Sequence, residues 1–253
     1  MSGSFFKPTA ETEHELQQEG NSISIAENVA RIRREMEDAA RAAGRDPREV
    51  KLCAATKMND ADAVRQAIAA GVDCCGENRV QELVRKRSED AYRGAPVHFI
   101  GHLQTNKVRQ VVGSVYLIQS VGSVRLLSAI DAEAKKQGIV QDILLEVNVA
   151  GEEAKTGFSP EEVLPLLDQM GNFSNICMRG LMSIPPIPAN PGDNLYFFQK
   201  IYQISVDIMG KKYDNVKVDC LSMGMSADFV DAIRCGATMI RIGTAIFGPR
   251  NYA

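Results

Sequence analysis

The first strand-like segment of the chain ends at a lysine whose amine could act as a nucleophile. Side chains alternate along residues 50–57, so Cys53, Ala55 and Lys57 share one face. Small residues on that face leave room for the Lys57 amine. Partial desolvation would lower its affinity for a proton and let it attack an aldehyde. The plainer alternative is a solvated lysine at a strand terminus.

Two turns near the end of the chain combine glycine with hydroxyl residues and could bind a phosphate group. They follow apolar runs within residues 221–230 and 238–248. Glycine lets backbone N–H groups approach a ligand, and the hydroxyls of Ser226 and Thr244 add donors. We expect Ser226 to be the N-cap of a helix, so that its N-terminus and the Gly243 turn complete a phosphate cradle.

Arg241 is expected to point away from the helices. Alternation separates it from Ile240 and Ile242, which suit a surface covered by helices. A buried arginine stays charged and has only donors, so it needs acceptors. A pyridine nitrogen is one candidate, and it would have to be unprotonated, which makes the ring a weak electron sink. The alternative is an ion pair with Glu77 or Glu146.

The remaining elements follow a regular βα rhythm. Strands are predicted at 50–55, 72–75, 97–100, 115–120, 143–149, 176–184, 216–221 and 238–242. Helices are predicted between them at 61–70, 79–87, 106–112, 124–137, 160–170, 194–209 and 226–235. This alternation indicates parallel βαβ units, and the strand number favours a single α/β domain, a closed (β/α)8 TIM barrel. An open doubly wound sheet is the alternative.

An extra N-terminal helix is predicted before the first strand. Ser24 and Glu27 form a capping-box pattern, and apolar residues recur at helical spacing up to about residue 43. Few residues follow the last strand, so this helix is expected to fill the gap in the outer ring. We expect residues 1–20, which are polar and aperiodic, to be a poorly ordered extension, and residues 21–253 to form the barrel domain.

Composition excludes several classes of function. The 253 residues are 45% hydrophobic and 24% charged with a net charge of −3, so no general attraction to nucleic acid or anionic membranes is expected. No apolar run reaches about 18 residues, so no membrane span is predicted. The six cysteines show no CxxC spacing, which favours reduced thiols and a cytoplasmic protein. On a strand, His98 and His102 would lie about 13 Å apart, too far to chelate one metal.

A closed barrel would bring the lysine and the phosphate cradle together. Its eighth strand lies beside its first, and the loops after strands seven and eight commonly bind phosphate. Pyridoxal 5′-phosphate (PLP) carries both an aldehyde and a phosphate. We therefore predict PLP as the cofactor. A barrel enzyme acting on a phosphorylated sugar is a further alternative, and it would leave Lys57 unmodified.

Long motifs from about residue 24 to the end resemble those of the pyridoxal phosphate homeostasis proteins. They are AATK at 54–57, GENRVQE at 76–82, HFIGHLQTNK at 98–107, NVAGEEAKTGF at 148–158, LSMGMS at 221–226 and RIGTAIFG at 241–248. This family resembles the N-terminal barrel of alanine racemase, the fold-type III architecture of PLP proteins. The chain departs from the pattern at Arg79, where members often carry tyrosine.

The resemblance implies a role for several residues. Lys57 would carry the cofactor as a Schiff base, Arg241 would face the pyridine nitrogen, and the phosphate would be held by Ser226, Gly243 and Thr244. From the same motifs, we expect Asn78 and Met223 to contact the cofactor. A plainer interpretation of Asn78 is the N-cap of the helix that follows it. No catalytic residue and no metal ligand are predicted.

The resemblance also implies a carrier or buffer in intracellular PLP homeostasis, without a demonstrated reaction. The alternative is an amino-acid racemase of the alanine racemase type, which needs a second base opposite Lys57, commonly a tyrosine from an additional domain. The sequence predicts no such domain, which favours the carrier. We expect a monomer whose partners are PLP and the PLP-dependent apoenzymes that would receive it.

Overall fold

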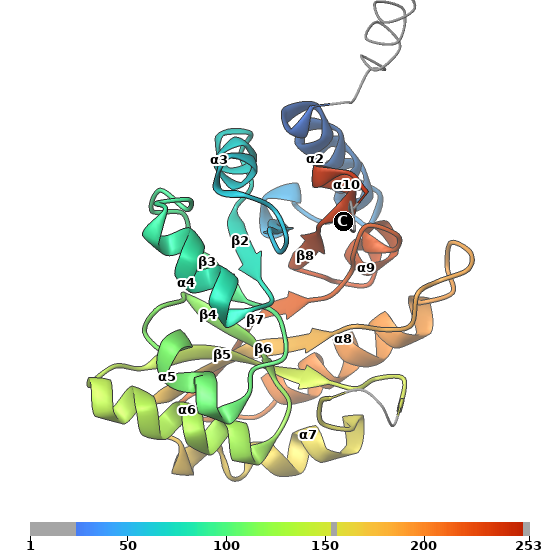
Figure 1. Cartoon of the computed structure of the whole chain (residues 1–253). Coiled ribbons are helices and arrows are strands. Elements are labelled where there is room, and N and C mark those ends of the chain that lie inside the picture. Colours follow the sequence, from blue (N-terminus) through green and yellow to red (C-terminus); the bar gives the residue numbers. More distant parts are fainter. Residues whose placement is uncertain (1–23, 153–155, 250–253) are drawn as a thin grey trace, which may run out of the picture.

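Eight parallel strands close into a barrel in which each strand pairs with the next and β8 pairs with β1 (Figure 1). The strands are β1 (Lys51–Ala55), β2 (Cys74–Glu77), β3 (Val97–Phe99), β4 (Leu117–Val121), β5 (Gln141–Val147), β6 (Ile176–Ser183), β7 (Val216–Ser222) and β8 (Met239–Ile242). This computed structural model describes residues 24–152 and 156–249, and the predicted extension at 1–20 lies outside them. The predicted barrel is confirmed, and the open sheet is wrong.

Helices surround the barrel and mostly match the predicted ones. They are α2 (Ile25–Ala42), α3 (Ala61–Ala69), α4 (Val80–Ser88), α5 (Val108–Val111), α6 (Val124–Gln137), α7 (Pro160–Leu167), α8 (Leu195–Met209), α9 (Phe229–Arg234) and α10 (Thr244–Phe247). The helix predicted at 106–112 is instead a 3-10 turn followed by the single turn of α5. None of the helices in the described part of the chain is long and apolar enough to cross a membrane.

The predicted N-terminal helix, α2, fills the gap in the outer ring. Ser24 and Glu27 form the predicted capping box at its start. Its buried face packs against α3, α9 and the short α10 (Figure 1). Asn28 Nδ2 donates to the carbonyl of Ile246 at 3.0 Å, which ties α2 to α10. The helix therefore supports the end of the chain that carries the predicted phosphate turn.

The core has two layers, and the division follows side-chain alternation. The larger layer lies between strands and helices and includes Ile240 and Ile242. The smaller layer fills the barrel with Cys53, Cys74, Leu117, Leu144, Met182, Cys220 and Met239. Cys53 therefore points inward as predicted, and the cysteines in this layer act as small hydrophobic residues. All six cysteines are free thiols.

Candidate cofactor-binding site

A cavity of about 270 Å³ opens at the carboxyl ends of β1 and β8. Its lining consists of Ala55, Lys57, Met58, Asn59, Gly243, Thr244, Phe247, Gly248 and Pro249. Three of the predicted site residues, Lys57, Gly243 and Thr244, therefore lie together, although nearly 190 residues separate the lysine from the turn. Because β1 pairs with β8, all three residues line the same cavity.

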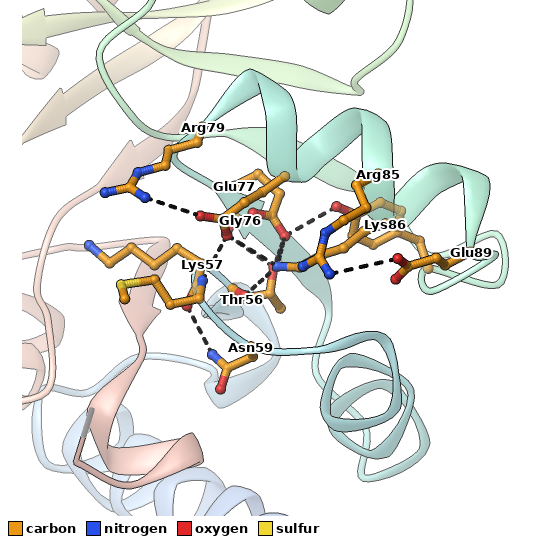
Figure 2. Close-up of polar contacts among 12 residues, drawn as sticks. Thr56, Lys57, Asn59, Gly76, Glu77, Arg79, Arg85, Lys86 and Glu89 are labelled. Carbon is orange, nitrogen blue, oxygen red and sulfur yellow. Dashed lines mark hydrogen bonds and ion pairs between the residues drawn. The ribbon is translucent and has the colours of Figure 1, made fainter. Parts of the chain in front are cut away.

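Lys57 lies in a tight turn that follows β1. The amide of Asn59 donates to the carbonyl of Thr56 at 3.2 Å, and Asn59 Nδ2 donates to the carbonyl of Lys57 at 3.0 Å. Met58 has a φ of 62°, which is unusual for a residue with a side chain. Figure 2 shows the Lys57 side chain leaving this turn on the side away from Lys86. The turn thus directs the lysine out of the helix layer.

The structure differs from the predicted phosphate cradle at one point. Helix α9 begins at Phe229, and its N-cap is Asp228 rather than Ser226. The buried Asp228 carboxylate accepts from the Met225 amide and from Asn194 Nδ2, both at 2.7 Å. The predicted helix N-terminus at Ser226 is therefore wrong, and the Met225 amide already has an acceptor.

Ser226 nevertheless lies beside the turn after β8. The amide of Ala245 donates to Ser226 Oγ at 3.4 Å, so the loop after β7 contacts the loop after β8. Thr244 is exposed at the start of α10, and Gly243 is half-buried before it. Thr244 and Gly243 therefore line the cavity, and Ser226 lies beside the same turn without being part of the lining.

Arg241 points into the barrel, as predicted, and is 5% exposed. Its Nη1 donates to Ser222 Oγ at 2.6 Å, and its Nη2 donates to the carbonyl of Ser183 at 2.9 Å. The alternative ion pairs are not formed: Glu77 pairs with Lys86, and Glu146 accepts from Thr156. Burial lowers the pKa of Arg241, and in the described chain no carboxylate forms an ion pair with it.

A chain of hydrogen bonds continues from Arg241 across the barrel. Ser222 Oγ donates to Gln119 Oε1 at 2.6 Å, and Gln119 Nε2 lies 2.8 Å from His98 Nδ1. Burial lowers the pKa of His98 to about 4, so the imidazole is neutral near pH 7 and Nδ1 accepts from the amide. His102 is exposed and separate from this chain. Gln119 and Ser222 could not be found from the sequence, because the hydrogen-bonded residues come from four different strands that meet only in the folded barrel.

Asn78 and Met223 occupy different environments. Asn78 follows β2, and its Oδ1 is buried without a hydrogen-bond partner among the described residues. Helix α4 begins at Val80 with Arg79 as its N-cap, so Asn78 is not the cap. Met223 is fully buried in the outer core layer, and its amide donates to the Met239 carbonyl at 3.1 Å. The structure thus leaves Asn78 with a buried acceptor that has no partner among the described residues, and Met223 is not part of the cavity lining.

Comparison with known proteins gives a consistent result. Residues 24–251 match the model of the alanine racemase N-terminal domain. A pyridoxal phosphate homeostasis protein of Aquifex aeolicus is 40% identical over 91% of this chain and 100% of its own length. One from Pseudomonas aeruginosa is 39% identical over 90% of this chain and 97% of its own.

Solved structures agree on the fold. PipY of Synechococcus elongatus, solved with PLP bound, is 31% identical, with a TM-score of 0.76 over 89% of this chain and 100% of its own. An alanine racemase of Clostridium difficile is 16% identical, with a TM-score of 0.67 over 88% of this chain and 57% of its own, a likeness of fold alone. Because the match to full-length relatives spans nearly all of the described residues, the chain belongs to the pyridoxal phosphate homeostasis protein family.

Proposed function

We propose that this protein binds pyridoxal 5′-phosphate on Lys57 as a Schiff base and acts as a carrier or buffer in intracellular PLP homeostasis. The observation that carries the proposal is the single cavity shared by Lys57, Gly243 and Thr244. The names of the relatives and the PLP-bound PipY structure support the same cofactor. In this proposal the cofactor is delivered intact in the cytoplasm, by a monomer, to apoenzymes that depend on it.

The residues around the cavity fit the chemical groups of PLP. When bound, PLP supplies an aldehyde and an electron-accepting pyridine ring. Lys57 would supply the amine that forms a C=N bond to this aldehyde with loss of water. The hydroxyls of Ser226 and Thr244 would donate hydrogen bonds to the phosphate, and the backbone at Gly243 would allow its close approach. The buried Oδ1 of Asn78 could accept a hydrogen bond from a ligand hydroxyl.

Arg241 gives the proposed site its chemical character. A guanidinium has only donors, so a pyridine nitrogen that faces it must accept a hydrogen bond and stay unprotonated. Serine side-chain and backbone oxygens hold the guanidinium in place, and no ion pair within the described chain neutralises it. An unprotonated ring withdraws electrons weakly. This keeps a bound amino acid from losing its Cα proton, which suits a carrier.

The racemase alternative lacks support at the cavity. Racemisation needs a second base on the face opposite the lysine. Among the described residues that line the cavity, Lys57 is the one with an ionisable side chain, and none of them is a tyrosine. The carrier function is therefore favoured.

Borohydride trapping tests the proposal. The protein is incubated with PLP and reduced, and the modified lysine is located by mass spectrometry. We expect the adduct on Lys57, and we expect Lys51→Ala, a change to the exposed lysine that begins β1, to leave the yield unchanged. An adduct mainly on another lysine would contradict the proposal, and an unmodified Lys57 would favour a different phosphate ligand.

A further inference from the structure

Two charged side chains of α4 hold the peptide groups on either side of Lys57. Lys86 Nζ donates to the carbonyl of Thr56 at 2.6 Å. Glu82 Oε2 accepts from the amide of Met58 at 2.7 Å. Glu82 and Lys86 are one helical turn apart, with Nζ 3.6 Å from Oε2. One face of α4 therefore contacts the peptide bond before Lys57 and the peptide bond after it.

The lysine of this pair has a fixed position in the core. Lys86 and Glu77 are both fully buried, with Nζ 2.7 Å from Oε1. The same carboxylate oxygen accepts from Thr56 Oγ1 at 2.5 Å and from the hydroxyl of Tyr92 at 3.1 Å. Figure 2 shows Lys86 reaching from α4 to Glu77 and Thr56. Because buried charges must remain paired, this network has little freedom to rearrange.

Glu82 has a different relation to the fold. Its side chain is 15% exposed, and it bonds to the turn after β1 rather than to a strand of the barrel. Glu82 accepts a hydrogen bond from the backbone amide of Met58. The positive φ of Met58 is energetically costly for a residue with a side chain. A charged acceptor at that amide stabilises the strained turn and so determines where the Lys57 side chain begins.

We propose that Glu82 is a positioning residue for Lys57, with the Lys86–Glu77 pair as its anchor. Glu82 fixes the Met58 peptide while Lys86 fixes the Thr56 peptide, so the lysine amine is held in reach of a ligand carbonyl in the cavity. The proposal rests on the proposed function, because it assigns a purpose to the direction of Lys57. A solvated lysine would need neither contact.

The test compares Glu82→Ala, Glu82→Gln and Glu89→Ala in the full-length protein. Glu89 is the C-cap of α4, and its Oε1 lies 3.7 Å from Nη1 of the exposed Arg85, so it is a matched glutamate without a hydrogen bond to the turn. Glu82→Gln keeps an acceptor oxygen for the Met58 amide. Thermal melting confirms that each variant is folded.

The first measurement is amide hydrogen exchange at Met58 without cofactor. Removal of one hydrogen bond to a charged acceptor should speed exchange in Glu82→Ala by about tenfold or more. Glu82→Gln should lie closer to the wild type, and Glu89→Ala should match it. Unchanged exchange in Glu82→Ala would overturn the proposal.

The second measurement is the rate at which PLP forms a Schiff base on Lys57, followed by absorbance. We expect Glu82→Ala to be slower by about tenfold, the effect of losing one such bond, with Glu82→Gln partly restored. A rate equal to that of the wild type would contradict positioning. If the wild type itself forms no adduct on Lys57, the proposed function fails, while the exchange measurement still decides whether Glu82 holds the turn.

Discussion

Two buried polar networks near the cavity differ in how their charge is compensated. In one, the fully buried Lys86 and Glu77 pair at 2.7 Å. In the other, Arg241 bonds to Ser222 Oγ and the Ser183 carbonyl, both neutral. The difference separates two roles. The neutralised pair holds backbone, whereas the guanidinium is a buried positive charge that forms no ion pair with a described residue.

The largest effect is expected from breaking the neutralised pair. Lys86→Met leaves the Glu77 carboxylate buried without its partner, which should destabilise the protein by about 3–5 kcal/mol. Arg85→Met, one position earlier on α4, removes an exposed cation whose side chain is 55% accessible. It should change the unfolding free energy by less than about 1 kcal/mol. Urea denaturation measures both variants. Equally small losses of unfolding free energy in both variants would show that the Lys86–Glu77 pair does not anchor the turn at Lys57.

The hydrogen-bond network of Arg241 predicts a pH dependence through His98, to which Ser222 and Gln119 connect it. Its pKa of about 4 in the folded protein lies below the ordinary value of 6.5, so between these values the unfolded chain binds a proton that the folded protein does not. The stability contribution is therefore complete above about pH 6.5 and is lost as pH falls toward 4. Between pH 7 and 4.5 the loss should be roughly 2–3 kcal/mol.

The control for this effect is His98→Gln, which removes the titrating group but keeps a polar side chain. Its unfolding free energy should fall less than that of the wild type over the same pH range. Parallel pH profiles for the two proteins would mean that His98 is already protonated or exposed in the folded state.

The phosphate turn should give a smaller effect, confined to ligand affinity. Thr244 is exposed, so removal of its hydroxyl leaves the core unchanged. Thr244→Ala should weaken PLP binding about tenfold to a hundredfold, the loss of one charge-assisted hydrogen bond worth roughly 1.5–3 kcal/mol. Thr105→Ala, at the edge of a separate cavity, is the matched control. Fluorescence titration gives both affinities, and a Thr244→Ala protein that binds like the wild type would remove Thr244 from the site.

Arg241→Glu tests the unmatched charge itself. A carboxylate at this position would favour a protonated pyridine nitrogen and so a stronger electron sink. Exchange of the Cα proton of added amino acids for deuterium should become faster by about tenfold or more, which corresponds to a barrier lower by roughly 1.4 kcal/mol. A variant that binds PLP with unchanged exchange and absorbance would show that Arg241 does not keep the cofactor unreactive.

The barrel could be predicted from the sequence because its determinants are local and repeated. Alternation placed Arg241 inside and Ile240 outside, and the capping box at Ser24 located α2. The helix start at Ser226 was wrong because two N-cap candidates lie within one turn, and buried Asp228 satisfies both Met225 and Asn194. Local patterns do not show which of two caps has tertiary partners.

The polar networks could not be predicted because their members are distant in sequence or resemble solvated residues. Lys86 lies among charged residues of α4, a pattern typical of an exposed face, yet its side chain is fully buried. Gln119 and Ser222 lie 103 positions apart and meet only when the barrel closes. In the GENRVQE motif, the spacing of Glu82 from Glu77 is visible, but its contact with the turn at Met58 is not.

The central claim is that Lys57 holds the cofactor, and dialysis of the PLP-loaded protein tests it most directly. Absorbance is recorded for the wild type, Lys57→Ala and the control Lys51→Ala after exhaustive dialysis. We expect the wild type and Lys51→Ala to stay yellow and Lys57→Ala to be colourless. A Lys57→Ala protein that stays as yellow as the wild type, with the cofactor bound to another lysine, would contradict it.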